Sequence, residues 1–278
     1  MKLSPQYDTP GFFRFEGLRD DTSLPLLRQR RRLASILSDL DDAQWAAPSR
    51  CDEWSVQDVI AHLVGVNQFW AVSIASGRHG EPTRFLSTFD PVASPAEMVD
   101  SVRSLPWATV LERFVDSIDA VAESVAGLDE DGWSMPAEAP PGHVPLRAVA
   151  LHALWDAWIH ERDITLPLGL VPVEEADEIA GCLRYAAALS PAFAVASGST
   201  RRGSILIETT DPEVRVVIDV GEGVVVHDGD APADALHLTG SAVELVEALS
   251  YRVPLPEPVA DEHQWMLDGL AQIFDRTS

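Results

Sequence analysis

CDEWSVQDVIAHLVGV, residues 51–66, contains a helix start and a histidine that lies within the predicted helix. Ser55 suits the N-cap, and Asp58 stands three residues later, where a capping box needs an acidic or amide side chain. The apolar residues that follow recur at helical spacing, which predicts a helix over 55–74 with His62 at the margin of its apolar stripe. Taken alone, His62 is more simply explained as a neutral histidine packed in a core.

LHALWDAWIHERDI, residues 151–164, belongs to another predicted helix, over 146–164, and it changes this interpretation. Between positions 148 and 159 only His152 and Asp156 are ionisable, so this helix is apolar on nearly every side and is expected to be buried. A buried carboxylate without a partner carries a large desolvation cost. Asp156 therefore requires a counter-charge or a metal ion.

The three residues His62, Asp156 and His160 together predict a site for one divalent metal ion. Asp156 and His160 are four residues apart and project from one face of their helix. Three protein ligands are typical of catalytic zinc sites, in which a fourth position stays open for water or substrate. The alternatives are an Asp–His ion pair that binds no metal, and a ligand set in which His152, one turn earlier, replaces one of the others.

Two further side chains lie close to these in the sequence. Asp163 is suited to orient the imidazole of His160 by a hydrogen bond, although a surface pair with Arg162 explains it equally well. Cys51 precedes a helix start, where the helix dipole favours a thiolate, but packing against Trp54 is the simpler explanation. The sequence contains no GxSxG, P-loop or GxGxxG motif, so nucleophilic and nucleotide-binding chemistry have little support.

The order of predicted helices also indicates how these residues could meet. Four helices predict a bundle within 22–170, after an N-terminal extension at 1–21, and they span about 24–40, 55–74, 108–127 and 146–164. Some thirty residues join the second helix to the third, with a short helix near 95–104, and an adjacent antiparallel pair needs far fewer. This long connection predicts a crossover, which would place the beginning of the second helix beside the end of the fourth.

The rest of the chain, 171–278, is predicted to be a connecting helix and a smaller α+β domain, so the fold class is α+β. The connecting helix is expected over 173–189. Four segments rich in β-branched residues are predicted strands: SILIETT, EVRVVIDV, GVVVHDG and DALHLTG. Helices are predicted over 241–252 and, as a last amphipathic helix, over 261–276.

The composition limits the classes of partner. With 46% hydrophobic and 23% charged residues the chain is globular, and its formal charge of −24 opposes nucleic acid and anionic membranes. RQRRR at 28–32 is expected to be the solvated face of the first helix. Two distant cysteines, no apparent signal peptide and no segment of membrane-spanning length predict a protein of the reducing cytoplasm.

WAAPSRCDEWSVQDVIAHLVGV, from residue 45, resembles the signature of the mycothiol-dependent maleylpyruvate isomerase family, in which a Pro-x-x-Cys-x-x-Trp-[Ser/Thr]-Val loop leads into a helix with a His-Leu pair. DAWIHERDITLPLGLVP, from residue 156, is similar to the family's acidic-x-x-x-His-x-x-Asp-[Ile/Leu] stretch. The resemblance covers most of residues 22–255. It implies a DinB-like, metal-binding four-helix bundle followed by a sterol-carrier-like α+β domain.

The resemblance also implies roles for individual residues. It makes His62, Asp156 and His160 the metal ligands, usually for zinc, with Asp156 standing where the isomerase has Glu. Arg252 matches an arginine that matters for activity in the isomerase, with Tyr251 in place of a preceding Gly, and it implies a catalytic residue that holds an anionic group. A surface arginine after a helix is the alternative. The first twenty residues lie outside the match and suggest a lid or a packing arm.

The function implied is that of a zinc-dependent or other metal-dependent enzyme. It would activate a low-molecular-weight thiol, mycothiol by resemblance, for transfer to a small electrophilic substrate or for isomerisation of that substrate. The alternative is a non-catalytic metal-binding bundle that senses or sequesters a small ligand. No nucleic-acid or membrane partner is expected, and the chain would be a monomer or homodimer.

Overall fold

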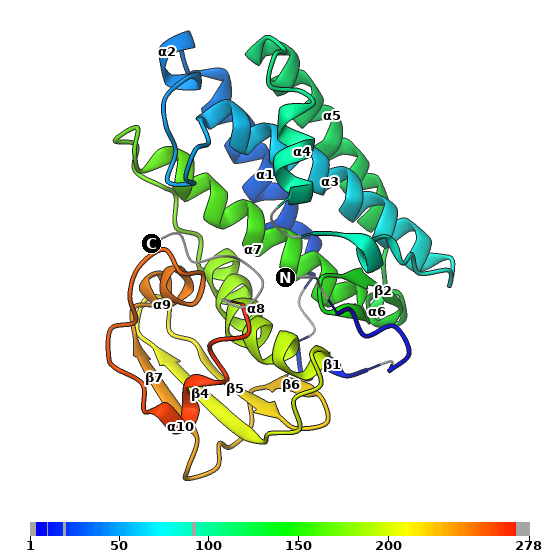
Figure 1. Ribbon diagram of the computed structural model, residues 1–278, viewed down its shortest axis with the longest axis vertical. Helices are drawn as coiled ribbons and strands as arrows, with labels where there is room; N and C mark the ends of the chain where they lie inside the picture. Colours follow the sequence, from blue (N-terminus) through cyan, green and yellow to red (C-terminus); the bar gives the residue numbers. More distant parts are fainter. Residues whose placement is uncertain (1–3, 10, 19–20, 91–92, 271–278) are drawn as a thin grey trace.

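The computed structural model describes residues 4–9, 11–18, 21–90 and 93–270, and it consists of a helical body joined to a body built on a sheet (Figure 1). The helical body contains α1 (Ser23–Ser38), α2 (Asp42–Trp45), α3 (Val56–Arg78), the short 3-10 helix η1 (Phe85–Thr88), α4 (Ala93–Asp100), α5 (Trp107–Val125), α6 (Glu130–Ser134) and α7 (Leu146–Thr165). The combination of helices and a sheet confirms the α+β class.

The long helices α1, α3, α5 and α7 form the bundle, and the long connection between α3 and α5 is a crossover, as predicted (Figure 1). Gln57, at the beginning of α3, donates from Nε2 to the carbonyl of Leu105 just before α5 at 2.9 Å. Arg78, at the end of α3, donates from Nη1 to the carbonyl of Ser124 near the end of α5 at 2.7 Å. These two helices therefore run in the same direction.

α7 runs the opposite way and occupies the centre of the fold. Its end reaches the beginning of α3, because the backbone N–H of Arg50 donates to the carbonyl of Asp163 at 3.0 Å. Every residue of α7 except Asp156 is buried, since α1, α3 and α8 (Ala176–Ala196) all pack around it. The nearly continuous apolar sequence of this helix is therefore explained by its neighbours on all sides.

The sheet body contains five strands in the order β1-β6-β5-β4-β7, with α8 and α9 (Ala242–Leu249) packed against it. The four predicted strands are confirmed as β4 (Gly203–Thr209), β5 (Arg215–Val220), β6 (Val224–His227) and β7 (Leu236–Gly240). The fifth, β1 (Phe13–Phe15), comes from the N-terminal segment and pairs in parallel with β6. Phe12 and Phe13 are buried there, so the described part of this segment is a packing arm.

A hairpin occupies the Pro-rich segment just before α7. β2 (Pro136–Ala139) and β3 (Gly142–Pro145) pair antiparallel; the prolines stand at the outer ends of the strands and in the turn between them, and none lies in a strand interior. Glu138, fully buried in β2, accepts hydrogen bonds from the Tyr7 hydroxyl, the Thr83 hydroxyl and two backbone N–H groups of η1. These tertiary contacts, which no local pattern reveals, stabilise the hairpin.

Two predicted helices end at different places. The connecting helix, predicted to stop at 189, continues as α8 through Pro191 to Ala196, because the residues after the proline are buried in the core. The predicted last helix, 261–276, has only α10 (Asp261–Gln264) within the described residues, and 271–276 lie outside them. After α10 the backbone bonds to α8 instead: Ser190 Oγ donates to the carbonyl of Leu267 at 2.7 Å and accepts from the N–H of Leu270 at 2.8 Å.

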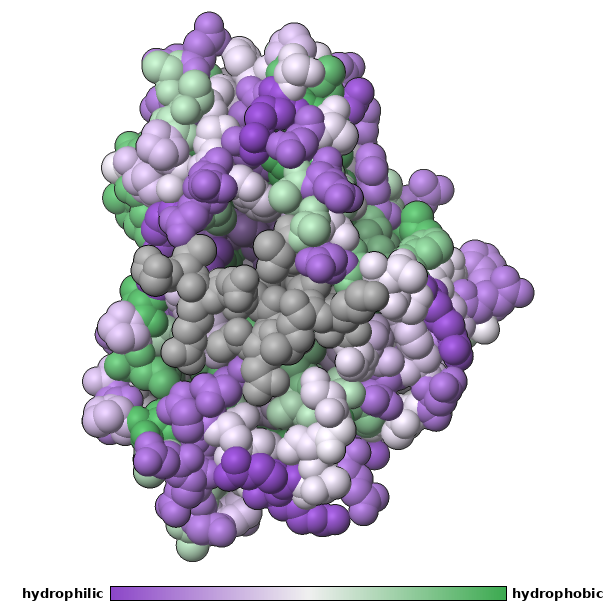
Figure 2. All heavy atoms as spheres, in the orientation of Figure 1, coloured by the Kyte–Doolittle hydropathy of each residue, from purple (hydrophilic) through white to green (hydrophobic). Residues whose placement is uncertain are grey.

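The basic run at 28–32 is not the solvated face that the sequence predicted. Gln29 and Arg30 are fully buried, and Arg32 forms ion pairs with the buried carboxylates of Glu161 and Glu178 at 2.9 and 2.6 Å. Arg30 instead binds the side chain of Asn67 and the carbonyl of Ala153, while Arg31 is exposed and Arg28 partly exposed, so only part of the run is solvated. On the side of the molecule that Figure 2 shows, the coloured residues are mostly hydrophilic, with scattered apolar areas.

Contrary to the prediction, two helices within the described residues, α3 and α8, are long and apolar enough to cross a membrane by length and composition. Of the apolar window of each helix, half is buried in α3 and 78% in α8. The core helix of a water-soluble protein has the same length and composition, so these helices are weak evidence for a membrane.

Candidate metal centre

The fold brings the three predicted metal ligands together. His62 lies on α3, and Asp156 and His160 lie one turn apart on α7. Asp156 Oδ1 is 4.0 Å from His62 Nε2 and 3.7 Å from His160 Nε2, and one ligand atom of each residue lies within 4.8 Å of the others. The two imidazole rings are 5.1 Å apart and meet edge to face. The antiparallel packing of α3 and α7 is what closes this group.

The donor set fits a divalent metal ion. A tetrahedral ion about 2.1 Å from each ligand holds ligand atoms about 3.4 Å apart, slightly closer than the distances observed. His62 Nδ1 and Asp156 Oδ2 are buried and have no hydrogen-bond partner among the described residues. Buried polar atoms are rarely left unpaired. Two imidazole nitrogens and a carboxylate suit zinc and similar transition metals.

The charge state of Asp156 suits the same role. Burial alone would raise the pKa of its carboxyl group, but contact with His62 and the charges of His160 and His62 hold that pKa well below its usual value. The side chains of His62, Asp156 and His160 are only 11%, 16% and 11% exposed. A negatively charged ligand is therefore kept ionised in a largely dehydrated site, where a cation is attracted strongly.

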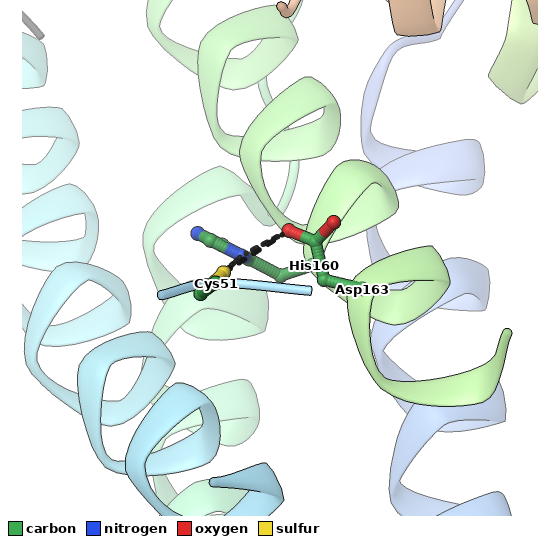
Figure 3. Close-up of side chains that lie close together, drawn as sticks. All are labelled: Cys51, His160 and Asp163. Carbon is green, nitrogen blue, oxygen red and sulfur yellow. Dashed lines mark hydrogen bonds and ion pairs between the residues drawn. The ribbon is translucent and has the colours of Figure 1, made fainter. Parts of the chain in front are cut away.

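A second carboxylate, Asp163, orients His160 from the other side of the ring. His160 Nδ1 lies 3.0 Å from Asp163 Oδ2 (Figure 3). Metal-binding histidines commonly donate their second N–H to such a carboxylate, which leaves the other nitrogen free for the metal. The predicted orienting role of Asp163 agrees with this geometry. The alternative surface pair is wrong, because Asp163 is fully buried and Arg162 binds Glu247 and Glu174.

Asp163 is the centre of a larger hydrogen-bonded cluster. Arg252, beyond α9, binds both of its oxygens, from Nε at 2.9 Å and from Nη2 at 2.8 Å. Arg50 donates to it from Nε at 3.0 Å, and Cys51 Sγ lies 3.3 Å from Oδ2. Burial would raise the pKa of Asp163, but its bonds to His160 and Arg252 lower it far below the usual value. The sequence carries no signal for the role of Arg50, whose partner is 113 residues away.

Cys51, His160 and Asp163 form a second group of close metal-ligating side chains (Figure 3). Cys51 Sγ is 3.6 Å from His160 Nδ1, but Arg252 Nη2 is also only 3.9 Å from that sulfur. Two guanidinium groups already bind Asp163, and their positive charges oppose a cation at this place. The group of His62, Asp156 and His160 is therefore the better candidate for a metal site. The second group holds the ring of His160 in place through Asp163.

His152 lies outside both groups found among the described residues. Its Nδ1 is 2.5 Å from the hydroxyl of Tyr185, and its ring packs against Trp70 and Trp155. Burial lowers the pKa of His152 to about 4, so the imidazole is neutral at pH 7 and shares one hydrogen bond with the Tyr185 hydroxyl. The sequence places His152 next to the site, but only the fold provides its tyrosine partner.

Arg252 reaches the site by way of an unusual backbone position. The preceding residue, Tyr251, has a φ of 57°, in the left-handed region that glycine adopts with least strain. The guanidinium of Arg252 contacts Asp163 and the Cys51 sulfur, and its side chain is 27% exposed. Its predicted catalytic contact with an anionic group stays a prediction.

Comparison with known proteins agrees with this geometry. The family model described as the mycothiol maleylpyruvate isomerase N-terminal domain matches residues 26–165. Among solved structures, a mycothiol-dependent maleylpyruvate isomerase is similar with a TM-score of 0.59, at 18% identity over 84% of this chain and 90% of that chain. A histidine-to-alanine mutant of the isomerase is similar with a TM-score of 0.58, at the same identity and coverage. At this identity the likeness to these structures shows the fold alone.

No curated protein matches the sequence significantly. The family model, however, spans half of the chain and includes His62, Asp156 and His160. The chain therefore belongs to the mycothiol maleylpyruvate isomerase N-terminal domain family.

Proposed function

We propose that this protein is a metal-dependent enzyme that activates a low-molecular-weight thiol for reaction with a small electrophile. The observation that carries the proposal is the convergence of His62, Asp156 and His160, whose ligand atoms lie within 4.8 Å of one another in a largely buried site. These three residues would hold the ion, and zinc fits the donor set best. When bound, such an ion would supply a position for a thiol and lower the pKa of that thiol.

The residues around the three ligands prepare the site for this chemistry. Asp163 fixes the ring of His160, so that its Nε2 faces Asp156. Trp54 packs against His62 with ring centroids 5.3 Å apart, and the low exposure of the ligands keeps most water away. A nucleophile in such surroundings is more weakly hydrated and more reactive than it is in water.

The thiol we propose is mycothiol, which the names of the family and of the similar isomerase carry. Two reactions are consistent with an activated thiol. Addition of the thiolate to a conjugated double bond, rotation and then elimination would isomerise the substrate and regenerate the thiol. Addition followed by protonation of the adduct, or displacement of a leaving group such as chloride, would transfer the thiol. We favour transfer as the broader chemistry, and we place the protein in the cytoplasm, where a thiol stays reduced.

Metal analysis combined with a thiol-coupling assay tests the proposal. The purified protein is expected to bind about one zinc ion per chain and to consume mycothiol in the presence of electrophiles such as maleylpyruvate and monochlorobimane. His62→Ala should lose both metal and turnover. His79→Ala is the matched control, because His79 is an exposed histidine just after the same helix.

Two results would contradict the proposal. If His62→Ala kept full thiol-dependent turnover, the ligand group would have no catalytic role. If the wild-type protein bound metal and a small ligand but consumed no thiol with any electrophile, the non-catalytic alternative, a sensing or sequestering bundle, would be favoured.

A further inference from the structure

The guanidinium of Arg252 is engaged by the protein itself. Nε and Nη2 form a two-point contact with the two oxygens of Asp163, at 2.9 and 2.8 Å. Nη1 is 3.4 Å from the carbonyl of Ser250, and Nη2 also lies 3.9 Å from Cys51 Sγ. A planar fork bound in this way fixes the orientation of the carboxylate as well as its charge.

We infer that Arg252 is a positioning residue, through which the C-terminal part of the chain holds the metal ligand His160 by way of Asp163. The inference rests on the proposed function, since it assigns a role to residues around the proposed metal site. It differs from the role that the family resemblance implies, in which this arginine holds an anionic group of the substrate.

The contacts form an unbroken path from the sheet body to the metal site. Arg252 sets the plane of the Asp163 carboxylate, and Asp163 Oδ2 then accepts a hydrogen bond from the N–H of His160 Nδ1 at 3.0 Å. With one proton held on Nδ1, Nε2 is the ring nitrogen that faces Asp156 Oδ1, 3.7 Å away. The ring of His160 is thereby oriented before any metal binds.

Neighbouring ion pairs also connect the end of α7, around Asp163, to α9. Arg50 binds Asp163 at one edge and both oxygens of Glu247, on α9, at 3.0 Å. Arg162 binds Glu247 as well, at 2.7 Å. Docking of α9 against the end of α7 and orientation of His160 therefore use one set of contacts. Because coupling between two events is reciprocal, metal binding should in turn stabilise this docking.

Loss of Arg252 has two opposing effects on metal affinity. Removal of a positive charge favours a nearby cation. Loss of the fork leaves Asp163 bound by Arg50 at Oδ1 only, and so loosens Oδ2, the oxygen that orients the ring of His160. Changes in the residues that support a metal-binding histidine typically lower metal affinity by about 10–100-fold. We expect orientation to dominate, because Arg252 touches the carboxylate directly and lies on the far side of His160 from the metal ligands.

Zinc titration of metal-free full-length protein tests the inference. Arg252→Ala is expected to weaken zinc binding by about 10–100-fold. Arg252→Lys keeps the charge but lacks the fork, so it should also bind zinc more weakly than the wild type. Arg184→Ala is the matched control, because Arg184 forms an ion pair with Asp228 and has no hydrogen bond to the Asp163 cluster. Its zinc affinity should equal that of the wild type.

A second measurement needs neither metal nor turnover. In metal-free protein labelled with ¹⁵N-histidine, NMR should show the proton of His160 on Nδ1, shifted downfield by its hydrogen bond to Asp163. That signal should weaken or disappear in Arg252→Ala and persist in Arg184→Ala. Thermal unfolding of each variant separates this local effect from loss of the fold, and Arg252→Lys provides a milder change if the alanine variant unfolds.

The outcomes separate this inference from the proposed function. Unchanged zinc affinity and an unchanged His160 signal in Arg252→Ala would overturn the inference; if turnover were then lost, Arg252 would act on the substrate directly. Wild-type zinc affinity in Arg252→Lys would overturn the requirement for the fork. If the wild-type protein showed no thiol-dependent turnover, the proposed function would fail, while the NMR signal in the metal-free variants would still decide whether Arg252 positions His160.

Discussion

Replacement of His62 by alanine should abolish the stabilisation of the protein by metal without abolishing the fold. The His62 side chain is only 11% exposed, has Trp54 and His160 as ring neighbours, and has no partner for Nδ1 among the described residues. Its truncation leaves a small cavity and is expected to lower the free energy of unfolding by roughly 1–3 kcal/mol in the metal-free protein. The same loss occurs with metal present, so it cancels when the two conditions are compared.

The increase in stability on addition of metal decides whether His62 is a ligand. Zinc at 100 times its dissociation constant stabilises the folded state by about 2.7 kcal/mol. For a domain of this size that corresponds to a rise in Tm of about 5–10 °C. The wild-type protein should show this rise in thermal unfolding monitored by circular dichroism, with and without zinc. His62→Ala should show little or none of it at the same zinc concentration.

His152→Ala is the matched control for this experiment. His152 is also a buried histidine close to Asp156, but it lies outside the ligand group and binds Tyr185. This variant should lose stability in the metal-free state and keep the full rise in Tm on addition of zinc. A full zinc-dependent rise in His62→Ala would refute the ligand assignment, and loss of the rise in His152→Ala would show that His152 is itself a ligand.

Three further predictions concern protons, the N-terminal arm and the Asp163 cluster. Burial alone would lower the pKa of His160, but Cys51, Asp163 and Asp156 raise it to about 10, so metal must displace a proton from this imidazole at pH 7. Calorimetry in buffers of different ionisation enthalpy should show about one proton released per metal ion. A metal affinity that is constant from pH 6 to 8 would contradict this. Gly142→Ala should destabilise the fold by roughly 1–3 kcal/mol, because Gly142 has a φ of 135° and an added Cβ would clash with the backbone of Gln6. Urea unfolding measures this change in the free energy of unfolding. A change smaller than the precision of the method would show that the close contact with Gln6 is dispensable. The pKa of Asp163 is depressed in the folded protein, so the stability that this carboxylate contributes is present above its unfolded pKa near 4 and is lost only as the pH falls through the lower folded pKa. The difference in unfolding free energy between wild type and Arg252→Ala should therefore be equal at pH 7 and pH 5.5. Its disappearance at pH 5.5 would count against the ion pair.

The parts of the site that could be read from the sequence depend on short-range geometry. Asp156 and His160 share a face because helical periodicity places residues four apart together, and the apolar sequence around them indicates burial. The place of His62 in a helix follows from the capping box at Ser55, which the structure confirms with both of its hydrogen bonds. The length of the connection after α3 then indicates the crossover that brings α3 against α7.

Other features could not be predicted, because their partners are far apart in the chain. Arg50 and Arg252 meet Asp163 across 113 and 89 residues, and no local pattern pairs them. The basic run at 28–32 resembles a solvated surface until α7 and α8 supply its buried carboxylate partners. The strand Phe13–Phe15 has nothing to pair with until β6 forms, more than two hundred residues later.

The sequence by itself determined the candidates for the metal centre on α3 and α7, with His152 still open as an alternative, because the periodicity of a helix and the desolvation cost of a carboxylate are properties of short segments. Only the tertiary structure decided how that centre is supported. His160 is held by Asp163, and Asp163 is held by an arginine from beyond α9. Hydrogen bonds between distant segments form only when both bodies are folded and docked, so no local sequence pattern predicts them.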